Sequence, residues 1–497
     1  MIQFRRIQII LLSIITIGLT GFIYRWHTLN DISQWIPPNM YDQDDNHDLV
    51  IKRQAIDNKY CGGPCRFILP VFIMEQESKA QMHFRQLAFM SGLVNRTIIL
   101  PNVGGSRLGA CLPHDFEFYY SLKWAQDNKQ HFNYITMNDF KQWLLERQAI
   151  QRPATSQSMH IHVNLRSHAL EPKNCFEQDL LLNMDGLPER RLYLNETANP
   201  TRRVYYENAV KEFFLGMHHD QDTGEIIQDN ITKNMEVLSV YYDRRFPFVH
   251  NPAAEPSIPY SETLNHQADT IAGSLSPFWA VHWRTERVEP SSNLVDCAMS
   301  LVNYMNRQVP LLTMNKNNNN NNKQEADLHQ QRQQQEQPTL FLLTDYPHVF
   351  NEEDLEESIL NNKTSRNMIP ASASFAPQNL TTHHHQAMQY VYQHLNIKVT
   401  HLGQDNKYSL PSNWSVVSIP DDIAHQDTGW LGILDKLLAM RADGFLAGAP
   451  GICGRKSSFT NQIMNERLDH PRLNVIDYFD LPKNEEKDDD DDDELDK

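Results

Sequence analysis

The stretch that decides the fold spans residues 66–100 and reads RFILPVFIMEQESKAQMHFRQLAFMSGLVNRTIIL. Residues 66–74 are a continuous apolar run of strand length, and residues 79–94 carry apolar side chains at helical spacing. Residues 96–100 form a second apolar run, which ends at Pro101. A strand, a helix and a strand in so short a segment predict a βαβ unit with parallel strands. We therefore expect an α/β protein built on parallel sheets.

The same alternation continues along the rest of the chain. The first half predicts helices at 137–147 and 204–217 and a strand at 159–163, and the second half predicts helices at 265–275 and 293–305 and strands at 278–283 and 339–344. A chain of 497 residues with 40% hydrophobic side chains is long enough for two such domains. We place the boundary near Pro252, which predicts domains at 60–252 and 253–482.

Two polar stretches interrupt the second domain. Residues 315–338 are rich in Asn and Gln and predict a low-complexity surface loop. Residues 361–385 also appear irregular from their pattern and end in three consecutive histidines at 383–385. Contiguous histidines can bind a metal adventitiously, but a solvated loop is the expected structure.

A glycine-rich turn near the C-terminus is the most informative motif. After a helix at 431–440 and a short strand at 444–446, the chain reads AGAPGICGRKSSFT at 447–460 and opens a helix that runs to residue 468. Glycines let the backbone approach a ligand, and a helix that opens with Ser457 and Ser458 offers free N–H groups and hydroxyls to a phosphate. The spacing is not that of a Walker loop. Ordinary helix capping by serine is the alternative.

Charged residues follow two of the buried strands. Arg284 comes directly after strand 278–283, where ligands of open α/β sheets bind, and its guanidinium suits a phosphate. Pairing with Glu286 to hold the loop is the alternative. Asp345 follows strand 339–344, where it is placed to accept from a ribose or base or to cap the next turn. Together with the glycine-rich turn these residues predict a nucleotide-diphosphate pocket. No Asp-x-Asp follows a strand in mid-chain, and the candidates at 42–44 and 220–222 lie in polar loops, so we expect no metal.

The N-terminus and the cysteines indicate the secretory pathway. Residues 7–24 are an apolar run behind an arginine pair, which predicts a cytoplasmic tail at 1–6, a transmembrane signal anchor at 7–24 and a stem at 25–59. A cleaved signal peptide is the alternative. Six cysteines without C-x-x-C spacing favour disulfides over zinc, and their pairing stays open. Six N-x-S/T sequons agree with a lumenal body in the Golgi or endoplasmic reticulum.

The charge of the chain is unevenly distributed. The formal net charge is −17, which excludes a nucleic-acid binder that works by bulk attraction to phosphate. Residues 483–497 carry ten acidic and three basic side chains, a net of −7. This C-terminal tail is expected to be solvated and disordered.

Three separated blocks resemble the GDP-fucose protein O-fucosyltransferases and the wider fucosyltransferase-like group. The blocks are RADGFLAG at 441–448 with SSFT at 457–460, FWAVHWR at 278–284, and the helix and strand at 87–101. The resemblance spans roughly residues 61–481, with a weak match between the blocks. It implies a GT-B-like architecture, in which two Rossmann-like domains face a cleft and the second domain holds GDP.

The resemblance also implies roles for individual residues. Arg284 would hold the β-phosphate and assist the departure of GDP, and no metal would be needed for the inverting chemistry. The remaining donor-binding residues would be His282, Asp345, Ser457, Ser458 and Phe459. The chain departs from the family at its first turn, where Glu75 or Glu77 is a candidate general base. An acidic first helical turn is the alternative for both residues.

These expectations lead to one principal hypothesis and two alternatives. The principal one is a membrane-anchored lumenal enzyme that transfers fucose from GDP-fucose to a protein Ser/Thr, with no cofactor. The first alternative is a GT-B transferase that uses another nucleotide sugar or a glycan acceptor. The second is a membrane-tethered module that binds a glycan or protein and has lost catalysis.

Overall fold

The computed structural model describes most of the chain between residues 47 and 482. The described residues are 47–161, 180, 182, 189–193, 203–219, 226–242, 248–286, 288–318, 338–346, 380–403, 411–419, 427–455, 457–469 and 475–482. The anchor expected at 7–24, the acidic tail and most of the Asn/Gln-rich insert lie outside them. Within these ranges, no helix combines the length and the apolar character that crossing a bilayer requires.

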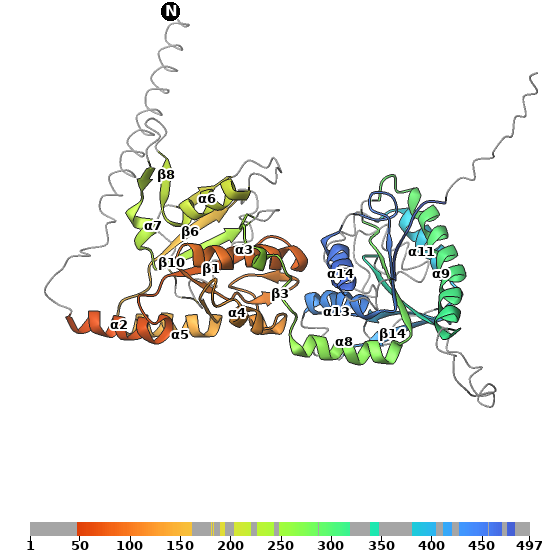
Figure 1. The fold of residues 1–497 in the computed structure, drawn as a ribbon, viewed down its shortest axis with the longest axis horizontal. Coiled ribbons are helices and arrows are strands. Elements are labelled where there is room, and N and C mark those ends of the chain that lie inside the picture. The colour runs from red at the N-terminus through yellow and green to blue at the C-terminus, as the bar shows by residue number, and fades with distance from the viewer. Residues whose placement is uncertain are drawn as a thin grey trace, which may run out of the picture.

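Two parallel six-stranded sheets organise the molecule, one in each domain (Figure 1). The strand order is β5-β2-β1-β10-β6-β7 in the first sheet and β14-β13-β12-β11-β15-β16 in the second. The first sheet's strands are β1 (Phe67–Ile73), β2 (Thr97–Ile99), β5 (Tyr134–Ile135), β6 (Ser156–Ile161), β7 (Arg190–Leu192) and β10 (Val237–Tyr242). The second sheet's are β11 (Phe278–Trp283), β12 (Thr339–Thr344), β13 (Val399–Gly403), β14 (Trp414–Ser418), β15 (Gly444–Gly448) and β16 (Val475–Phe479).

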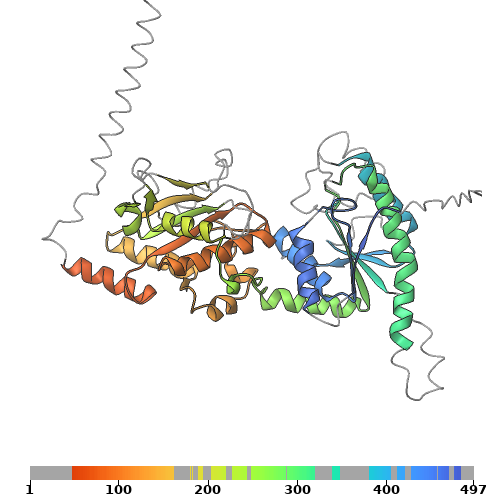
Figure 2. The same ribbon diagram turned by 45° about the horizontal axis from the view of Figure 1, so that its top comes forward.

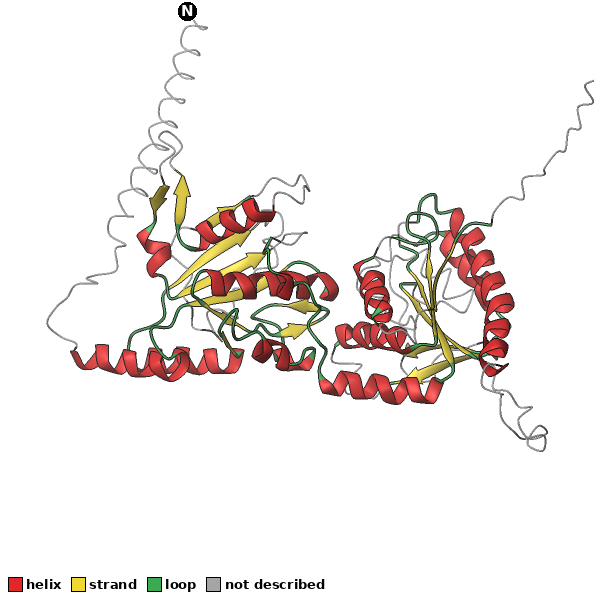
Figure 3. Ribbon diagram, in the orientation of Figure 1, coloured by secondary structure: helices red, strands yellow, loops and turns green. Residues whose placement is uncertain are grey.

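Helices cover both faces of each sheet, as Figure 3 shows by secondary structure. In the first domain they are α2 (His47–Cys61), α3 (Glu77–Leu93), α4 (Lys123–Asp127), α5 (Met137–Ala149), α6 (Arg203–Phe214) and α7 (Asn230–Asn234). In the second they are α8 (Glu262–Leu275), α9 (Asn293–Asn318), α11 (Thr382–His394), α13 (Thr428–Arg441) and α14 (Ser458–Leu468). Short hairpins β3 (Val103–Gly104) with β4 (Arg107–Leu108) and β8 (Met217–His219) with β9 (Ile226–Gln228), and 3-10 turns η1 (Phe116–Phe118) and η5 (Pro252–Ala254), complete the described elements.

The mixed α/β architecture with parallel sheets is consistent with the GT-B-like fold that we expected. Strands β1, β11 and β12 form where the apolar runs predict them, because a strand covered on both faces is apolar at nearly every position. In each sheet the chain first adds strands on one side of a central strand and later on the other. The resulting switch points lie between β1 and β10 and between β11 and β15, and ligands of such sheets bind at the strands' carboxyl ends.

The apolar core extends from one domain into the other. One cluster of buried side chains contains Phe84 on α3 and also Leu434 on α13. In two views α13 and α14 lie on the side of the second domain that faces the first (Figures 1 and 2). Two further clusters fill the outer halves, under α5 in the first domain and under α9 and α11 in the second.

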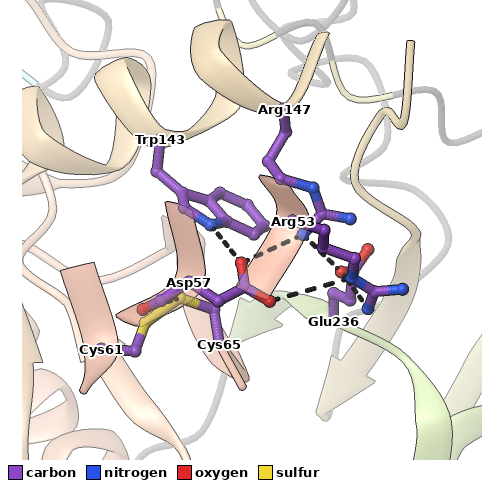
Figure 4. The surroundings of a disulfide bond; sticks show 7 residues. All are labelled: Arg53, Asp57, Cys61, Cys65, Trp143, Arg147 and Glu236. Atoms are coloured by element: carbon purple, nitrogen blue, oxygen red, sulfur yellow. Dashed lines mark hydrogen bonds and ion pairs between the residues drawn. A yellow bond between two sulfur atoms is a disulfide. The ribbon is translucent and has the colours of Figure 1, made fainter. Parts of the chain in front are cut away.

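The structure corrects the expected stem at its C-terminal end. Helix α2 occupies residues 47–61 and packs beside α5, so the folded domain begins before residue 60. Polar bonds hold the helix: Asp57 accepts from the Trp143 indole at 2.9 Å and from Arg147 at 3.2 Å, and Arg53 reaches Glu236 at 2.8 Å (Figure 4). The Cys61–Cys65 disulfide closes its C-terminal end. A helix attached by charges and a disulfide lacks the apolar stripe by which sequence patterns reveal helices.

Two other expectations change. The histidines at 383–385 open helix α11 and are not part of a solvated loop, since His384 and His385 are buried. Helix α9 continues to Asn318 and so enters the insert expected at 315–338. Smaller shifts affect element ends: β6 covers 156–161 instead of 159–163, and Met217 belongs to β8.

Candidate nucleotide site

The carboxyl ends of β11, β12 and β15 bring the charged and glycine-rich motifs to one edge of the second sheet. In register, Trp283 of β11 faces Thr344 of β12, and His282 faces Ala447 of β15. The residues that follow these strands, among them Arg284 and Asp345, therefore emerge together. This is the position that ligands occupy in open α/β sheets.

Arg284 is largely buried and held by a neighbouring carboxylate. Its Nη2 lies 2.7 Å from Glu286 Oε2, and its Nη1 lies 3.5 Å from the Ser457 hydroxyl. Its buried Nε has no hydrogen-bond partner among the described residues. A second guanidinium, that of Arg455, lies 3.8 Å from Glu286. The Arg–Glu pairing that we gave as an alternative is present, and it leaves the Nε donor of Arg284 unsatisfied.

Asp345 supports the loop that carries Arg284. Its carboxylate accepts from the Thr285 amide at 2.8 Å, the Thr285 hydroxyl at 2.8 Å and the Glu286 amide at 3.0 Å. Burial raises the pKa of Asp345, while these three bonds oppose the shift. The side chain thus fixes the backbone after β11, and in this arrangement its acceptors are used within the protein.

A neutral aromatic surface lies beside the guanidinium. The His282 ring packs against Phe459 at a centroid distance of 4.9 Å, and its Nδ1 lies 2.9 Å from the Thr460 hydroxyl. Burial, with a smaller contribution from the Arg284 charge, lowers the pKa of His282 to about 3. The imidazole is therefore uncharged at neutral pH and offers a flat, polarisable face to a ligand.

The glycine-rich turn is tightly built. A side chain at Gly448 would place Cβ 2.5 Å from the Cys453 carbonyl oxygen, so only glycine fits there. The same carbonyl accepts from the Trp283 indole at 2.9 Å, and a disulfide joins Cys453 to Cys297 on α9. This gives the tryptophan after His282, for which the sequence suggested no role, a clear one: it holds the turn against β11.

Ser457 and Ser458 begin helix α14. Ser457 is buried at the N-cap and makes no side-chain capping bond to its own helix, and Ser458 is the first helical residue. The hydroxyl of Ser457 instead lies on the Arg284 side. The free amides of a helix N-terminus beside a guanidinium form a suitable environment for a phosphate.

The two candidate bases differ in their surroundings. Glu77 is buried at the first turn of α3, where its oxygens accept from Gln81 at 2.8 Å and from Tyr120 and Tyr260 at 3.1 and 2.9 Å. It also forms an ion pair with Lys436 of α13. Glu75 lies two residues earlier, in the turn between β1 and α3, with 21% of its side chain exposed and Lys79 at 3.5 Å.

The histidines at the start of α11 hydrogen-bond to the loop that follows β11 and to its surroundings. His384 Nε2 lies 3.3 Å from the Thr285 carbonyl oxygen, and His383 Nδ1 lies 3.0 Å from the Ser291 hydroxyl. His385 meets the Tyr346 hydroxyl at 2.5 Å, and burial lowers its pKa to about 4. The three rings thus hydrogen-bond to the segments that follow β11 and β12. No cluster of three His, Cys, Asp or Glu side chains suited to a metal occurs in the described ranges.

Two residues of α13 escaped the sequence-based assignment. Lys436 is buried at the boundary of the two domains, and Asp435 beside it is partly buried. Burial raises the pKa of Asp435 to about 8. The sequence contains one indication that these two residues are buried. Within the predicted amphipathic helix, the Asp–Lys dipeptide stands where the apolar stripe would otherwise continue.

The sequence matches no known family model and no curated protein. Among solved structures, the chain is similar to POFUT1 in complex with GDP, at 12% identity and a TM-score of 0.39 over 84% of this chain and 98% of that one. POFUT1 in complex with GDP-fucose shows 13% identity and a TM-score of 0.39 over 85% and 100%. A further GDP complex shows 13% identity and a TM-score of 0.40 over 84% and 99%. Sequence identity and TM-scores this low do not identify the function, which therefore has to be inferred from the residues of the site.

Proposed function

We propose that the protein is a glycosyltransferase that transfers fucose from GDP-fucose to the side-chain hydroxyl of a Ser or Thr residue in an acceptor protein. The observation that carries this proposal is the meeting of Arg284, the N-terminus of α14 and the neutral His282–Phe459 surface at one switch point. A cation and helix amides suit a diphosphate, and the aromatic surface suits a base or sugar. The choice of GDP-fucose rests on the resemblance of the three sequence blocks.

In the proposed reaction the acceptor oxygen attacks the anomeric carbon of fucose from the face opposite GDP. The new carbon–oxygen bond forms as the bond to the β-phosphate oxygen breaks, GDP leaves with the bonding electron pair, and a carboxylate takes the hydroxyl proton. Arg284 and the first amides of α14 would stabilise the charge that develops on the diphosphate. Attack from the face opposite GDP inverts the anomeric configuration, and because Arg284 and the helix amides would stabilise the diphosphate charge, the proposal includes no metal.

Glu75 is the better candidate for the base. Its side chain is 21% exposed and it follows β1 at the switch point of the first sheet, where an acceptor bound between the domains would lie. The oxygens of Glu77 already accept hydrogen bonds from several buried donors, so Glu77 is poorly placed to contact an acceptor hydroxyl. Glu75→Gln is expected to reduce turnover by about 10²–10⁴-fold, the range of general base catalysis, while GDP binding is unchanged.

The first test is thermal unfolding of the purified full chain with GDP, UDP, ADP or CMP, each with EDTA. A ligand that binds only the folded state raises the midpoint according to its concentration relative to Kd. A rise with GDP alone supports the proposal and leads to an assay of GDP release from GDP-fucose. A rise with UDP instead would favour another sugar donor. If no nucleotide shifts the midpoint, the transferase proposal fails.

We also propose that the apolar run at 7–24 anchors the enzyme in the membrane of the Golgi or endoplasmic reticulum, with the catalytic body in the lumen. Disulfide-bonded cysteines in the described part of the chain agree with an oxidising compartment. Protease protection in sealed microsomes tests this topology, since a lumenal body resists digestion until detergent is added. Digestion of the body in intact vesicles would contradict it.

A further inference from the structure

The domain boundary contains a buried charge that the reaction scheme above does not use. Lys436 of α13 has only 1% of its side chain exposed. Its ammonium group donates to the Ser78 hydroxyl at 2.8 Å, the Tyr260 hydroxyl at 2.8 Å and the Gln462 side-chain oxygen at 2.7 Å, and it pairs with Glu77. All three ammonium hydrogens thus have oxygen acceptors without water, as a buried charge requires.

These partners come from three places in the fold, of which the first is Tyr260, just before α8. Glu77 and Ser78 form the first turn of α3, directly after the switch-point strand of the first domain. Gln462 lies on α14, one turn after Phe459, whose ring is 5.3 Å from the Lys436 ammonium. One charge therefore contacts both the turn that follows β1 and the helix whose N-terminus faces Arg284.

We propose that Lys436 is a positioning residue that sets the distance between the β1–α3 turn and the nucleotide site, with Glu77 as its anchor. The proposal rests on the proposed function, because the β1–α3 turn would carry the base Glu75 and α14 would hold the donor. Placing acceptor and donor groups in register is worth large factors in rate, and small displacements are costly. Two neutral phenols, Tyr120 and Tyr260, complete the anchor by donating to Glu77.

The Lys436–Glu77 ion pair is tested by a double-mutant cycle, in which thermal unfolding is measured without ligand. Lys436→Met and Glu77→Gln should each lower the midpoint, because each leaves its partner buried and unbalanced. The double variant should recover most of this loss, since neither charge then remains. Arg441→Met, which breaks a more exposed pair with Asp269 on α8 within one domain, is the control and should shift the midpoint little. If the double variant lowers the midpoint by the sum of the two single losses, Lys436 and Glu77 are not coupled and the proposal is refuted.

The positioning role is tested by GDP-fucose hydrolysis, with rates normalised to the number of GDP-binding sites and measured well below each midpoint. Lys436→Met should lower kcat at least tenfold with little change in KM, and adding Glu77→Gln should restore much of that loss. Gln462→Leu, which cuts only the contact to α14, should lower kcat with a small change in midpoint. An effect on the midpoint alone would reduce Lys436 to a structural role.

Two outcomes separate this inference from the proposed function. If the double variant folds and is as inactive as Glu77→Gln alone, Glu77 is the proton acceptor and the inference is wrong although the transferase proposal stands. If wild-type protein binds no GDP while the double-mutant cycle shows coupling between Lys436 and Glu77, the ion pair contributes to stability but positions a different site. In that case the positioning role in fucose transfer is overturned together with the proposed function.

Discussion

Two charged residues that follow neighbouring strands, Arg284 and Asp345, have different environments in this fold. Arg284 keeps a buried donor without a partner in the described part of the chain. Asp345 uses its carboxylate on the amides and hydroxyl of the adjacent loop. The sequence predicts donor-binding roles for both, but the contacts favour direct ligand binding by Arg284 and an indirect, loop-holding role for Asp345.

Replacing Arg284 by Ala should weaken GDP binding by roughly 10–150-fold, which corresponds to about 1.5–3 kcal/mol for hydrogen bonds to a charged group. Arg284→Lys should recover only part of the loss, because an ammonium lacks the planar fork. Isothermal titration with GDP measures both. Arg441→Ala on the α8–α13 surface is the control. Equal affinity of Arg284→Ala and wild type would remove Arg284 from the site.

The raised pKa of Asp435 predicts that the free energy of unfolding of the protein depends on pH. Its pKa is about 8 in the folded protein and about 4 in an unfolded chain. A raised native pKa contributes most to stability below about pH 4, and this contribution is lost as the pH rises through 8. Asp435→Asn, which stays neutral, should therefore gain stability relative to wild type as the pH rises from 4 to 8.

Paired thermal unfolding of Asp435→Asn and wild type across this pH range measures the difference. Asp269→Asn, an exposed substitution on α8, should differ from wild type by a small and constant amount. A difference for Asp435→Asn that stays flat with pH would show that this carboxyl is well solvated in the folded protein.

At the scale of elements, the turn between β15 and α14 depends on backbone contact. The Trp283 indole and the Cys297–Cys453 disulfide fix it from two sides. Gly448 allows the strand to pass against the Cys453 carbonyl. A rigid turn keeps the N-terminus of α14 in place relative to Arg284, which favours preorganised phosphate binding.

Gly448→Ala should destabilise the protein and weaken GDP binding, because its Cβ would lie 2.5 Å from a backbone oxygen that the disulfide and the indole bond hold in place. Gly273→Ala is the matched control: it lies inside α8 with nothing within 4 Å of the added Cβ. That change should raise the midpoint slightly, since Ala is favoured over Gly by about 0.5–1 kcal/mol in helices. Equal midpoints for the two variants would contradict the tight turn.

At the scale of the whole molecule, polar side chains at the N-cap and within α13 bind the first domain. Lys436 does so through Glu77 and Ser78, and Asp427 does so at the helix N-cap. The Asp427 carboxylate accepts from the Trp430 amide of its own helix at 2.9 Å and from the Gly105 amide of the first domain at 2.8 Å. It also accepts from the Tyr119 hydroxyl of the first domain. Together with the shared apolar cluster, these bonds should make the domains unfold as one unit.

Asp427→Ala should therefore cost more than the loss of an ordinary helix cap, which is about 1 kcal/mol. Thr136→Ala provides that reference, because Thr136 caps α5 and accepts from the Asp139 amide. Urea unfolding followed by fluorescence compares the two. Combining Asp427→Ala with Tyr119→Phe should give less than the sum of the single losses. Equal losses for the Asp427 and Thr136 variants would mean that the contact between domains contributes nothing.

The local order of elements was predictable from the sequence. The bounds of β11 and β12 agree with their apolar runs, and the helix from Ser458 to Leu468 begins where the serines indicate. These features depend on residues close in the chain, through apolar spacing and capping. The motif at the carboxyl end of β11 was also visible, because parallel strands bring their ends to one edge.

Only the tertiary structure decided which distant groups meet. The pairing of Glu77 with Lys436 spans 359 residues, and that of His384 with the Thr285 carbonyl spans 99, so no local pattern encodes either. The attachment of α2 depends on charges and a disulfide in place of an apolar stripe. The sequence by itself determined the parallel α/β domains and the residues available to a phosphate. Which of those residues remain free to bind one was decided by burial and by partners that only folding brings together.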